Sequence, residues 1–469
     1  LHIPRYSNTA MSALMHLGDR VFHAADAAFF KTEQHTATMV RVVQLFGIIG
    51  GKQAKELLWK KIEFPNKQVV SELLLSLNAL GFESKDFQSA RIKLIIEGLL
   101  GDIAWNIKAI QDIPRVYPTD PMDAELLQAL KEENNVNLNN LFILLGMIYD
   151  VHNVQLVKEN LAHGSMDSVT FAIEMLDVFV EDEIKPMLLP ILDDITDKER
   201  LGLLLNFFPP EHFESYSDLL TQIINRDFNR ITRYTKSLAI NRLHQLPEAH
   251  VSNSLIANLF NPDVLLLQSA ANSIYQMDSE AYQAHTNRLK SYSKLRLDKI
   301  ILPPVFLYEE EENHQKMLLV ERVRFIKSIP NFAAIPGDSI TRMVDAMNER
   351  KVPLGTALIN EGDKGDQPLF VIIDGKVDLI RSGAVFKSLG PKDILGEEAI
   401  LFMEKFDYQA VTSEETSFFI LPKEEVFDLM TLHSEILKAF LDLIDTTVKP
   451  ESIDPFDLSI LDDNVSVFN

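Results

Sequence analysis

The chain has 469 residues, of which 46% are hydrophobic, and this length and composition are typical of a folded protein with several domains. Its formal net charge of −23 opposes binding to nucleic acid, whose phosphate backbone is also negative. The chain contains no cysteine, which excludes disulfides, thiolate metal ligands and a cysteine nucleophile. We therefore expect no nucleic-acid partner, no metal and no resident cofactor.

The sequence has no apolar run of the length that a membrane helix needs. The longest candidate covers residues 141–149 and ends at Asp150. The chain begins Leu-His-Ile-Pro, without an initiator methionine or a signal-peptide pattern, which suggests a piece of a longer protein. These features predict a cytoplasmic location, or one at the cytosolic face of the inner membrane if a transporter domain precedes the chain.

The first 300 residues have the periodicity of amphipathic helices, with hydrophobic residues at steps of three and four, as in Leu73, Leu74, Leu77 and Leu80. The segment around Gly47 matches the one around Gly146 at an offset of 99 residues, and a second match has an offset of 36. Helix pairs that cannot bury their apolar faces alone stack into a solenoid.

Residues 35–300 therefore resemble the HEAT and armadillo class of α-helical repeats. The resemblance implies a surface on which a protein partner, or an upstream region of the same protein, docks. An irregular helical bundle is the alternative. The repeat region is followed by four consecutive glutamates, at 309–312, which predict a solvated linker because adjacent carboxylates repel one another and do not converge on a metal.

From about residue 323, short apolar runs alternate with glycine turns. The runs 369–373 and 377–380 flank Asp374-Gly375, a dipeptide that favours a tight hairpin, and Ser382-Gly383 favours a second hairpin before the run 385–389. The run 416–421 predicts a closing strand, and residues 423–431 predict a helix. Many short strands with regular turns indicate a small antiparallel sandwich or barrel.

Three blocks in this region resemble the cyclic nucleotide-binding domain family. They are PLGTALINEGDKGD at 353–366, LFVIIDGKV at 369–377 and LGPKDILGE at 389–397. The resemblance covers residues 323–448. It implies a jelly-roll β-sandwich with an N-terminal helical bundle and two C-terminal helices, near 423–432 and 433–447, which move when ligand enters and transmit that motion.

In that family a short cassette binds the ligand, with backbone N–H groups and an arginine for the phosphate and a glutamate for the ribose. The resemblance assigns Gly396 and Glu397 to the conserved glycine and glutamate, and Ala399 to the start of the short helix. Tyr408 stands where the family has its arginine, Asp407 adds a negative charge beside it, and an ammonium does not replace a guanidinium fork. The candidate binding residues are Gly396, Glu397, Glu398, Ala399, Lys405, Tyr408, Gln409 and Ala410.

Two carboxylates, Glu397 and Glu398, oppose an anionic ligand when no guanidinium balances them. One hypothesis is that the site binds cyclic AMP or cyclic GMP. The other, which the missing guanidinium favours, is that the domain kept the sandwich and lost tight binding of the ligand.

The sequence thus predicts a multidomain protein: an all-α superhelical HEAT-like repeat domain at 1–306, an acidic linker and helix at 307–322, a jelly-roll cyclic nucleotide-binding-like domain with flanking helices at 323–448, and an acidic tail, predicted to be disordered, at 449–469. We expect a non-enzymatic regulatory or scaffolding function in signal transduction, because no acid, base and nucleophile cluster appears. One alternative is the cytosolic part of a bacterial ATP/ADP translocase-like membrane protein, which this architecture resembles. Another is an enzyme in the helical half.

Overall fold

The structure is a computed structural model that describes residues 4–32, 34–114, 120–302, 317–363, 367–397, 405–432 and 434–447. The chain divides into two compact units. The first comprises Leu1–Val323 and Pro336–Thr341, and the second comprises Arg324–Ile335 and Arg342–Asn469. The predictions for residues 303–316, for Glu398 and Ala399, and for the 449–469 tail fall outside the described residues.

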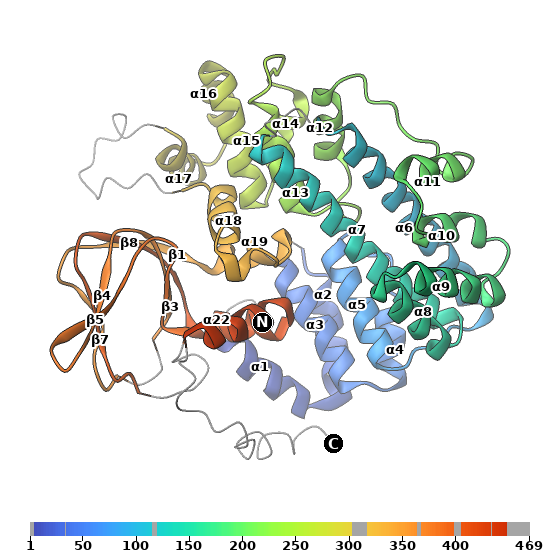
Figure 1. Cartoon of the computed structure of the whole chain (residues 1–469), viewed down its shortest axis with the longest axis horizontal. Coiled ribbons are helices and arrows are strands. Elements are labelled where there is room, and N and C mark those ends of the chain that lie inside the picture. Colours follow the sequence, from blue (N-terminus) through green and yellow to red (C-terminus); the bar gives the residue numbers. More distant parts are fainter. Residues whose placement is uncertain are drawn as a thin grey trace. The chain divides into compact units, whose positions relative to one another are not determined.

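The first unit is built from helices (Figure 1). Side chains cap the N-termini of several of these helices. One is Asp263, whose carboxylate accepts a hydrogen bond from the backbone N–H of Leu266 at 3.2 Å. The helices are α1 (Pro4–His16), η1 (Gly18–Val21), α2 (Phe22–Phe29), α3 (Thr36–Ile49), α4 (Gly51–Trp59), α5 (Lys67–Ala79), α6 (Asp86–Asp112), α7 (Pro121–Ile148), α8 (Val151–His163), α9 (Met166–Phe179), α10 (Lys185–Leu192), α11 (Asp197–Leu204), α12 (Tyr216–Asn225), α13 (Arg233–Leu243), α14 (Asn253–Asn258), α15 (Val264–Met277), α16 (Ser279–Thr286), α17 (Ser291–Ile301) and α18 (Leu319–Lys327).

The prediction of a mostly helical N-terminal region is confirmed. The boundaries of α3, α4 and α5 recur about 99 residues later in the end of α7, in α8 and in α9. The offset of 36 does not persist, because α13 and α15 begin at residues 233 and 264, only 31 apart. The connection after α12 is longer than the one after α14. A regular HEAT-like solenoid therefore stays a prediction. Within the described ranges, no helix combines the length and apolar character required to cross a bilayer.

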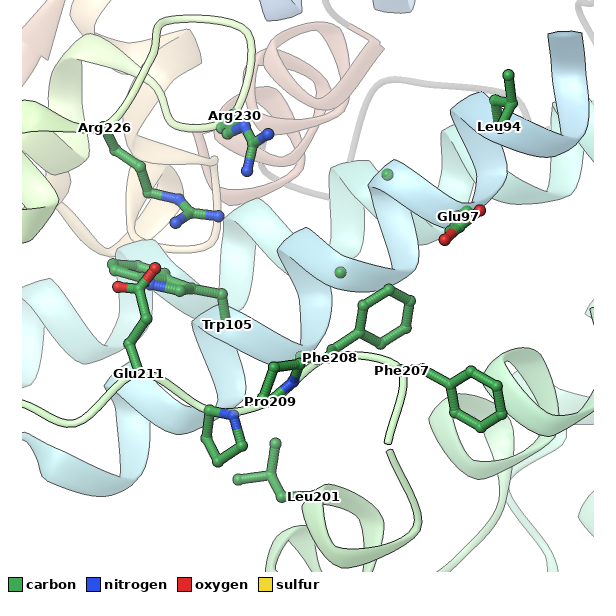
Figure 2. Close-up of a pocket in the computed structure, with 14 residues that line it drawn as sticks. Leu94, Glu97, Trp105, Leu201, Phe207, Phe208, Pro209, Glu211, Arg226 and Arg230 are labelled. Atoms are coloured by element: carbon green, nitrogen blue, oxygen red, sulfur yellow. The ribbon is translucent and has the colours of Figure 1, made fainter. Parts of the chain in front are cut away.

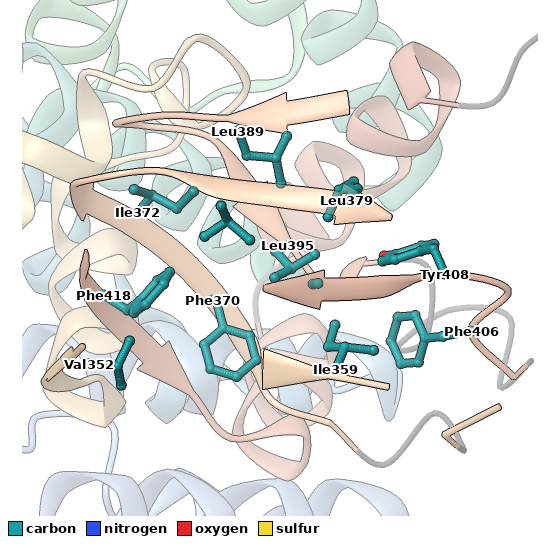
Figure 3. Packing of buried hydrophobic residues seen from close by; sticks show 12 residues of the cluster. Val352, Ile359, Phe370, Ile372, Leu379, Leu389, Leu395, Phe406, Tyr408 and Phe418 are labelled. Atoms are coloured by element: carbon teal, nitrogen blue, oxygen red, sulfur yellow. The ribbon is translucent and has the colours of Figure 1, made fainter. Parts of the chain in front are cut away.

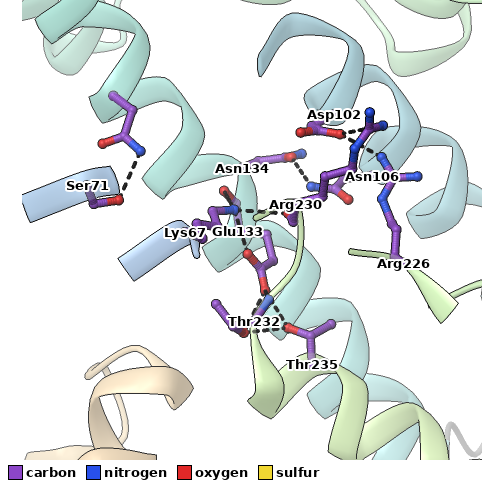
Figure 4. Close-up of polar contacts among 11 residues, drawn as sticks. Lys67, Ser71, Asp102, Asn106, Glu133, Asn134, Arg226, Arg230, Thr232 and Thr235 are labelled. Atoms are coloured by element: carbon purple, nitrogen blue, oxygen red, sulfur yellow. Dashed lines mark hydrogen bonds and ion pairs between the residues drawn. The ribbon is translucent and has the colours of Figure 1, made fainter. Parts of the chain in front are cut away.

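One buried carboxylate ties three helices of this unit together (Figure 4). Glu133 of α7 accepts from Nζ of Lys67 in α5 at 2.6 Å, from the backbone N–H and Oγ1 of Thr232 at 2.7 Å each, and from Oγ1 of Thr235 in α13 at 2.8 Å. Thr232 is the N-cap residue of α13, so the carboxylate also neutralises the positive end of that helix. This arrangement fixes where α13 starts.

The second unit contains a β-sandwich of two antiparallel four-stranded sheets. The strand orders are β1-β8-β3-β6 and β2-β7-β4-β5. Hydrophobic residues from both sheets meet between them, as expected from the alternating pattern of the strands (Figure 3). The elements are η3 (Pro330–Phe332), α19 (Gly337–Ala346), β1 (Asn348–Val352), β2 (Ala357–Ile359), β3 (Leu369–Asp374), β4 (Val377–Arg381), β5 (Ala384–Leu389), β6 (Ile394–Leu395), β7 (Gln409–Thr412), β8 (Thr416–Leu421), α21 (Lys423–Leu432) and α22 (Ser434–Thr447). The division between the units falls within α18 and α19.

The hairpin predicted at Asp374-Gly375 is wrong. β3 pairs with β6 and β8, whereas β4 pairs with β5 and β7, so this turn carries the chain from one sheet to the other. Gly375 has φ +97°, and a Cβ there would lie 2.7 Å from the carbonyl oxygen of Glu415. The glycine is needed because the crossing passes directly against the start of β8.

The second predicted hairpin is confirmed. Ser382 and Gly383 both have positive φ, 52° and 80°, and join β4 to β5 in a two-residue turn. The two predicted C-terminal helices are α21 and α22. Phe440 of α22 packs edge-to-face on Phe332 of η3, with ring centroids 5.7 Å apart. The helix that ends the described chain is therefore attached to the helical segment before the sandwich.

Candidate functional site

The first part of the predicted cassette follows the short strand β6. Leu395 and Ile394 pair with Phe370 and Val371 of β3, which places Gly396 at the end of the pair. Gly396 has φ +99°, and a Cβ there would lie 2.8 Å from the carbonyl oxygen of Pro368. The position therefore requires glycine for both backbone conformation and space. Glu397 follows it and is buried.

The second part of the cassette re-enters the sandwich before β7. The backbone of Phe406 forms two hydrogen bonds with the 360–363 loop, accepting from the N–H of Gly362 at 2.7 Å and donating to the carbonyl oxygen of Asp363 at 3.1 Å. The side chain of Phe406 is buried in the sandwich core. These contacts fix the direction of the chain as it enters β7.

Tyr408, where the family resemblance predicts an arginine, is part of the hydrophobic core. Only 4% of the residue is exposed, and it belongs to the same buried cluster as Leu395 (Figure 3). Its ring lies edge-to-face with Phe406 and Phe386, with centroids 5.5 and 6.0 Å away. The side chain therefore fills space between the sheets, where a guanidinium would have to be paired.

A guanidinium lies close by, on the neighbouring strand. Arg381, the last residue of β4, donates from Nη2 to both carboxylate oxygens of Asp407, at 2.8 and 2.9 Å. β4 pairs with β7 so that Ile380 faces Gln409, and one step further along the ladder brings Arg381 level with Tyr408. The guanidinium also lies over the ring of Phe386, 4.5 Å from its centroid. The cation nearest in register to Tyr408, Arg381, is thus already paired with Asp407.

The remaining predicted site residues have different surroundings. Lys405 is exposed. Gln409 and Ala410 are the first residues of β7, and the Ala410 side chain is fully buried between the sheets. Glu398 and Ala399 lie outside the described residues, so the predicted short helix is not tested.

A titratable carboxyl lies in the first C-terminal helix. Burial raises the pKa of Glu425 to about 7, and the negative charges of Asp428 and Glu424 act in the same direction. Asp428 is itself buried, one turn further along α21. This helix therefore carries charge that changes in the physiological pH range.

The C-terminal unit matches a known family. The family model described as "Cyclic nucleotide-binding domain" matches residues 349–433, which include β1 from its second residue, the other seven strands and all of α21. The C-terminal part of the chain contains a cyclic nucleotide-binding domain. The match includes each residue of the predicted cassette.

Several solved structures are similar to part of this chain. A cyclic nucleotide-binding domain from Methylobacillus flagellatus KT is 22% identical, with 28% of this chain and 77% of that chain covered and a TM-score of 0.25. The N-terminal domain of a transcriptional regulator from Streptomyces coelicolor A3(2) is 23% identical, with coverage of 26% and 91% and a TM-score of 0.24. The Catabolite Activator Protein of Thermus thermophilus is 22% identical, with coverage of 29% and 62% and a TM-score of 0.24.

Sequence reasoning missed Arg381. Arg381 is the last residue before the Ser382-Gly383 turn. Its place beside Tyr408 follows only from the pairing of β4 with β7, because the two residues are 27 positions apart in the sequence. A prediction that paired β4 with β7, instead of with β3, would have placed Arg381 beside Tyr408.

Proposed function

We propose that the chain is a non-enzymatic regulatory region in which a cyclic nucleotide-binding domain has low affinity for cyclic AMP and cyclic GMP. One observation carries the proposal: Tyr408 occupies the arginine position and is buried in the hydrophobic core. A charge-assisted contact to phosphate contributes about 1.5–3 kcal/mol, so its loss lowers affinity tenfold or more.

The nearby charges support this proposal. Arg381 is engaged by Asp407, and Glu397 contributes a further carboxylate to the cassette. An incoming phosphate must compete with Asp407 for the guanidinium. Since each of these carboxylates repels an anion, the site as it stands favours a weakly charged ligand over a cyclic nucleotide.

We further propose that the C-terminal helices transmit the state of the sandwich. Val426 and Leu429 of α21 and Ile436 of α22 are buried, whereas Leu437 of α22 is exposed and available to a partner. A ligand shifts the position of such helices only if it binds the two arrangements with different affinity. In this proposal the helical unit is the surface on which a protein partner or an upstream region docks.

The test is direct binding of labelled cyclic AMP and cyclic GMP to the full chain and to the Tyr408→Arg variant. We expect weak binding by the parent and tighter binding by the variant. Because arginine in the core risks misfolding, thermal unfolding of the variant is measured alongside. Binding by the parent as tight as that of an arginine-containing domain would refute the proposal, and no binding by either protein would leave only the docking function.

A further inference from the structure

A cavity of about 520 Å³ lies in the helical unit, remote in sequence from the cyclic nucleotide-binding domain (Figure 2). One stripe of α6 forms its floor, the segment that follows α11 forms one wall, and the turn after α12 supplies two arginines. The volume falls within the usual range of small-molecule sites. All of the lining residues belong to the first unit, so the cavity is independent of the cassette.

Two glycines of α6 line the floor of this cavity and leave the helix backbone there without side chains of its own. A Cβ at Gly98 would meet no atom within 4 Å, so the helix face is open there. A Cβ at Gly101 would lie 3.2 Å from the ring of Phe208, which packs directly on the helix backbone. Glycine inside a long helix costs about 1 kcal/mol relative to alanine. The two positions reduce helix stability but leave a flat, open slot over Gly98, beside the Phe208 ring that packs on Gly101.

The arginines lie at one end of the slot. The guanidinium of Arg226 stacks on the indole of Trp105, 3.8 Å from the ring centroid, and its Nη2 donates to Asp102 at 2.7 Å. Its buried Nε has no hydrogen-bond partner among the described residues. Among the described residues, the guanidinium of Arg230 has one long contact, 3.5 Å from Nη1 to Oδ1 of Asp102, and 51% of the side chain is exposed. Most of the donors of Arg230 are therefore open to a ligand.

The carboxylates around this end are already engaged. Asp102 is shared by both arginines, and Glu211 accepts from Nε1 of Trp105 at 2.9 Å. Burial lowers the pKa of Arg226, and the attraction of Asp102 opposes that shift. Glu97 lies further along the floor, toward the other end (Figure 2). Its charge repels an anion from that end and directs it toward Arg230.

We propose that this cavity binds a small organic anion with a flat apolar body. Its carboxylate or phosphate pairs with Arg230, and its ring lies in the slot over Gly98, against Phe208. A guanidinium suits such anions because its N–H groups form paired hydrogen bonds in one plane. The flat slot and the prolines and aromatics of its wall suit an unsaturated ring. This site would give the helical unit a ligand of its own, separate from any cyclic nucleotide.

The test uses Trp105 as the reporter. The chain has only two tryptophans, so Trp59→Phe leaves Trp105 alone in the cavity. The probe is phenylacetate, and the matched controls are phenylethanol, which keeps the ring without the charge, and acetate, which keeps the charge without the ring. We expect phenylacetate to change the Trp105 emission saturably, with both controls at least about tenfold weaker.

Variants of the full chain locate the binding. Arg230→Gln should weaken phenylacetate binding about tenfold, and Gly98→Leu should abolish it by filling the slot. Gly202→Leu makes the same exchange at an open, exposed position of α11 outside the lining and should leave binding unchanged. The proposal fails if the parent shows no saturable change, if phenylethanol binds as well as phenylacetate, or if Arg230→Gln binds like the parent. The Arg230 result stands even if Gly98→Leu does not fold.

Discussion

Arg381 and Asp407 form an ion pair that joins the end of β4 to the segment before β7, directly beside the buried ring of Tyr408. In this domain the guanidinium nearest in register to the expected phosphate position is paired with an internal carboxylate. The pair is exposed, so it contributes little to stability, and its larger effect is on what the site can bind.

Removal of that carboxylate should therefore improve anion binding. We expect Asp407→Asn to raise the affinity for cyclic AMP several-fold, because Arg381 becomes free to donate to phosphate. The unfolding free energy should change by less than about 1 kcal/mol, since the pair is exposed. Isothermal titration calorimetry measures the affinity. The double variant Asp407→Asn with Arg381→Gln is the control, and an equal gain in that variant would show that Arg381 is not the cation involved.

Gly396 should not tolerate a side chain. Gly396→Ala forces a Cβ to 2.8 Å from the carbonyl oxygen of Pro368 at φ +99°, so we expect a loss of about 2–3 kcal/mol in the stability of the sandwich. Gly383→Ala is the matched control, because Gly383 also has positive φ, +80°, but its Cβ would meet no atom within 4 Å. It should cost about 1 kcal/mol. Calorimetric unfolding compares the two, and equal losses would mean that the contact with Pro368 does not matter.

Glu425 should make the stability of the second unit depend on pH. Its pKa of about 7 in the fold lies above the ordinary 4.5, so the folded state holds an extra proton between these values. The stability associated with this proton is present below pH 4.5 and is lost as the pH rises through 7. Glu425→Gln should therefore stabilise the unit at pH 8 and have no such effect at pH 4.5. Melting temperatures at both pH values test this, and a pH-independent difference would contradict it.

The buried pair of Lys67 and Glu133 should contribute far more to stability than an exposed ion pair. Glu133→Gln leaves the Lys67 ammonium buried without its counter-charge, and we expect a loss of about 3–5 kcal/mol. Glu63→Gln breaks the exposed pair with Arg91, 2.8 Å long, and should cost at most about 1 kcal/mol. Urea unfolding followed by tryptophan fluorescence reports on this unit, which contains both tryptophans. Similar losses in the two variants would mean that burial of the pair is not decisive.

Local patterns in the sequence predicted the elements well. The runs 369–373, 377–380 and 416–421 correspond to β3, β4 and β8, and the Ser382-Gly383 turn has the positive φ values that such a dipeptide supplies. The short strands β1, β2, β6 and β7 were not singled out, because two to five residues carry little periodicity. Their pairing is long-range and depends on contacts that no local pattern records.

The candidate site shows the same limit. The resemblance identified Gly396, and the structure gives the physical reason for glycine there, the close approach of Pro368. It also identified Tyr408 as the position without a guanidinium, but not that the ring is buried or that Arg381 lies alongside. The cavity on α6 was invisible as well, because Gly98 and Arg230 are 132 residues apart and only the fold brings them together.

The hydrogen bonds that converge on Glu133 also determine how the helical unit opens. Since a single carboxylate is bonded to both α5 and α13, neither helix can detach from α7 without breaking the same junction. Amide protons in the middle of these three helices should therefore exchange with solvent at a common rate, as one cooperative segment. Fraying at the chain's first helix would leave that segment closed.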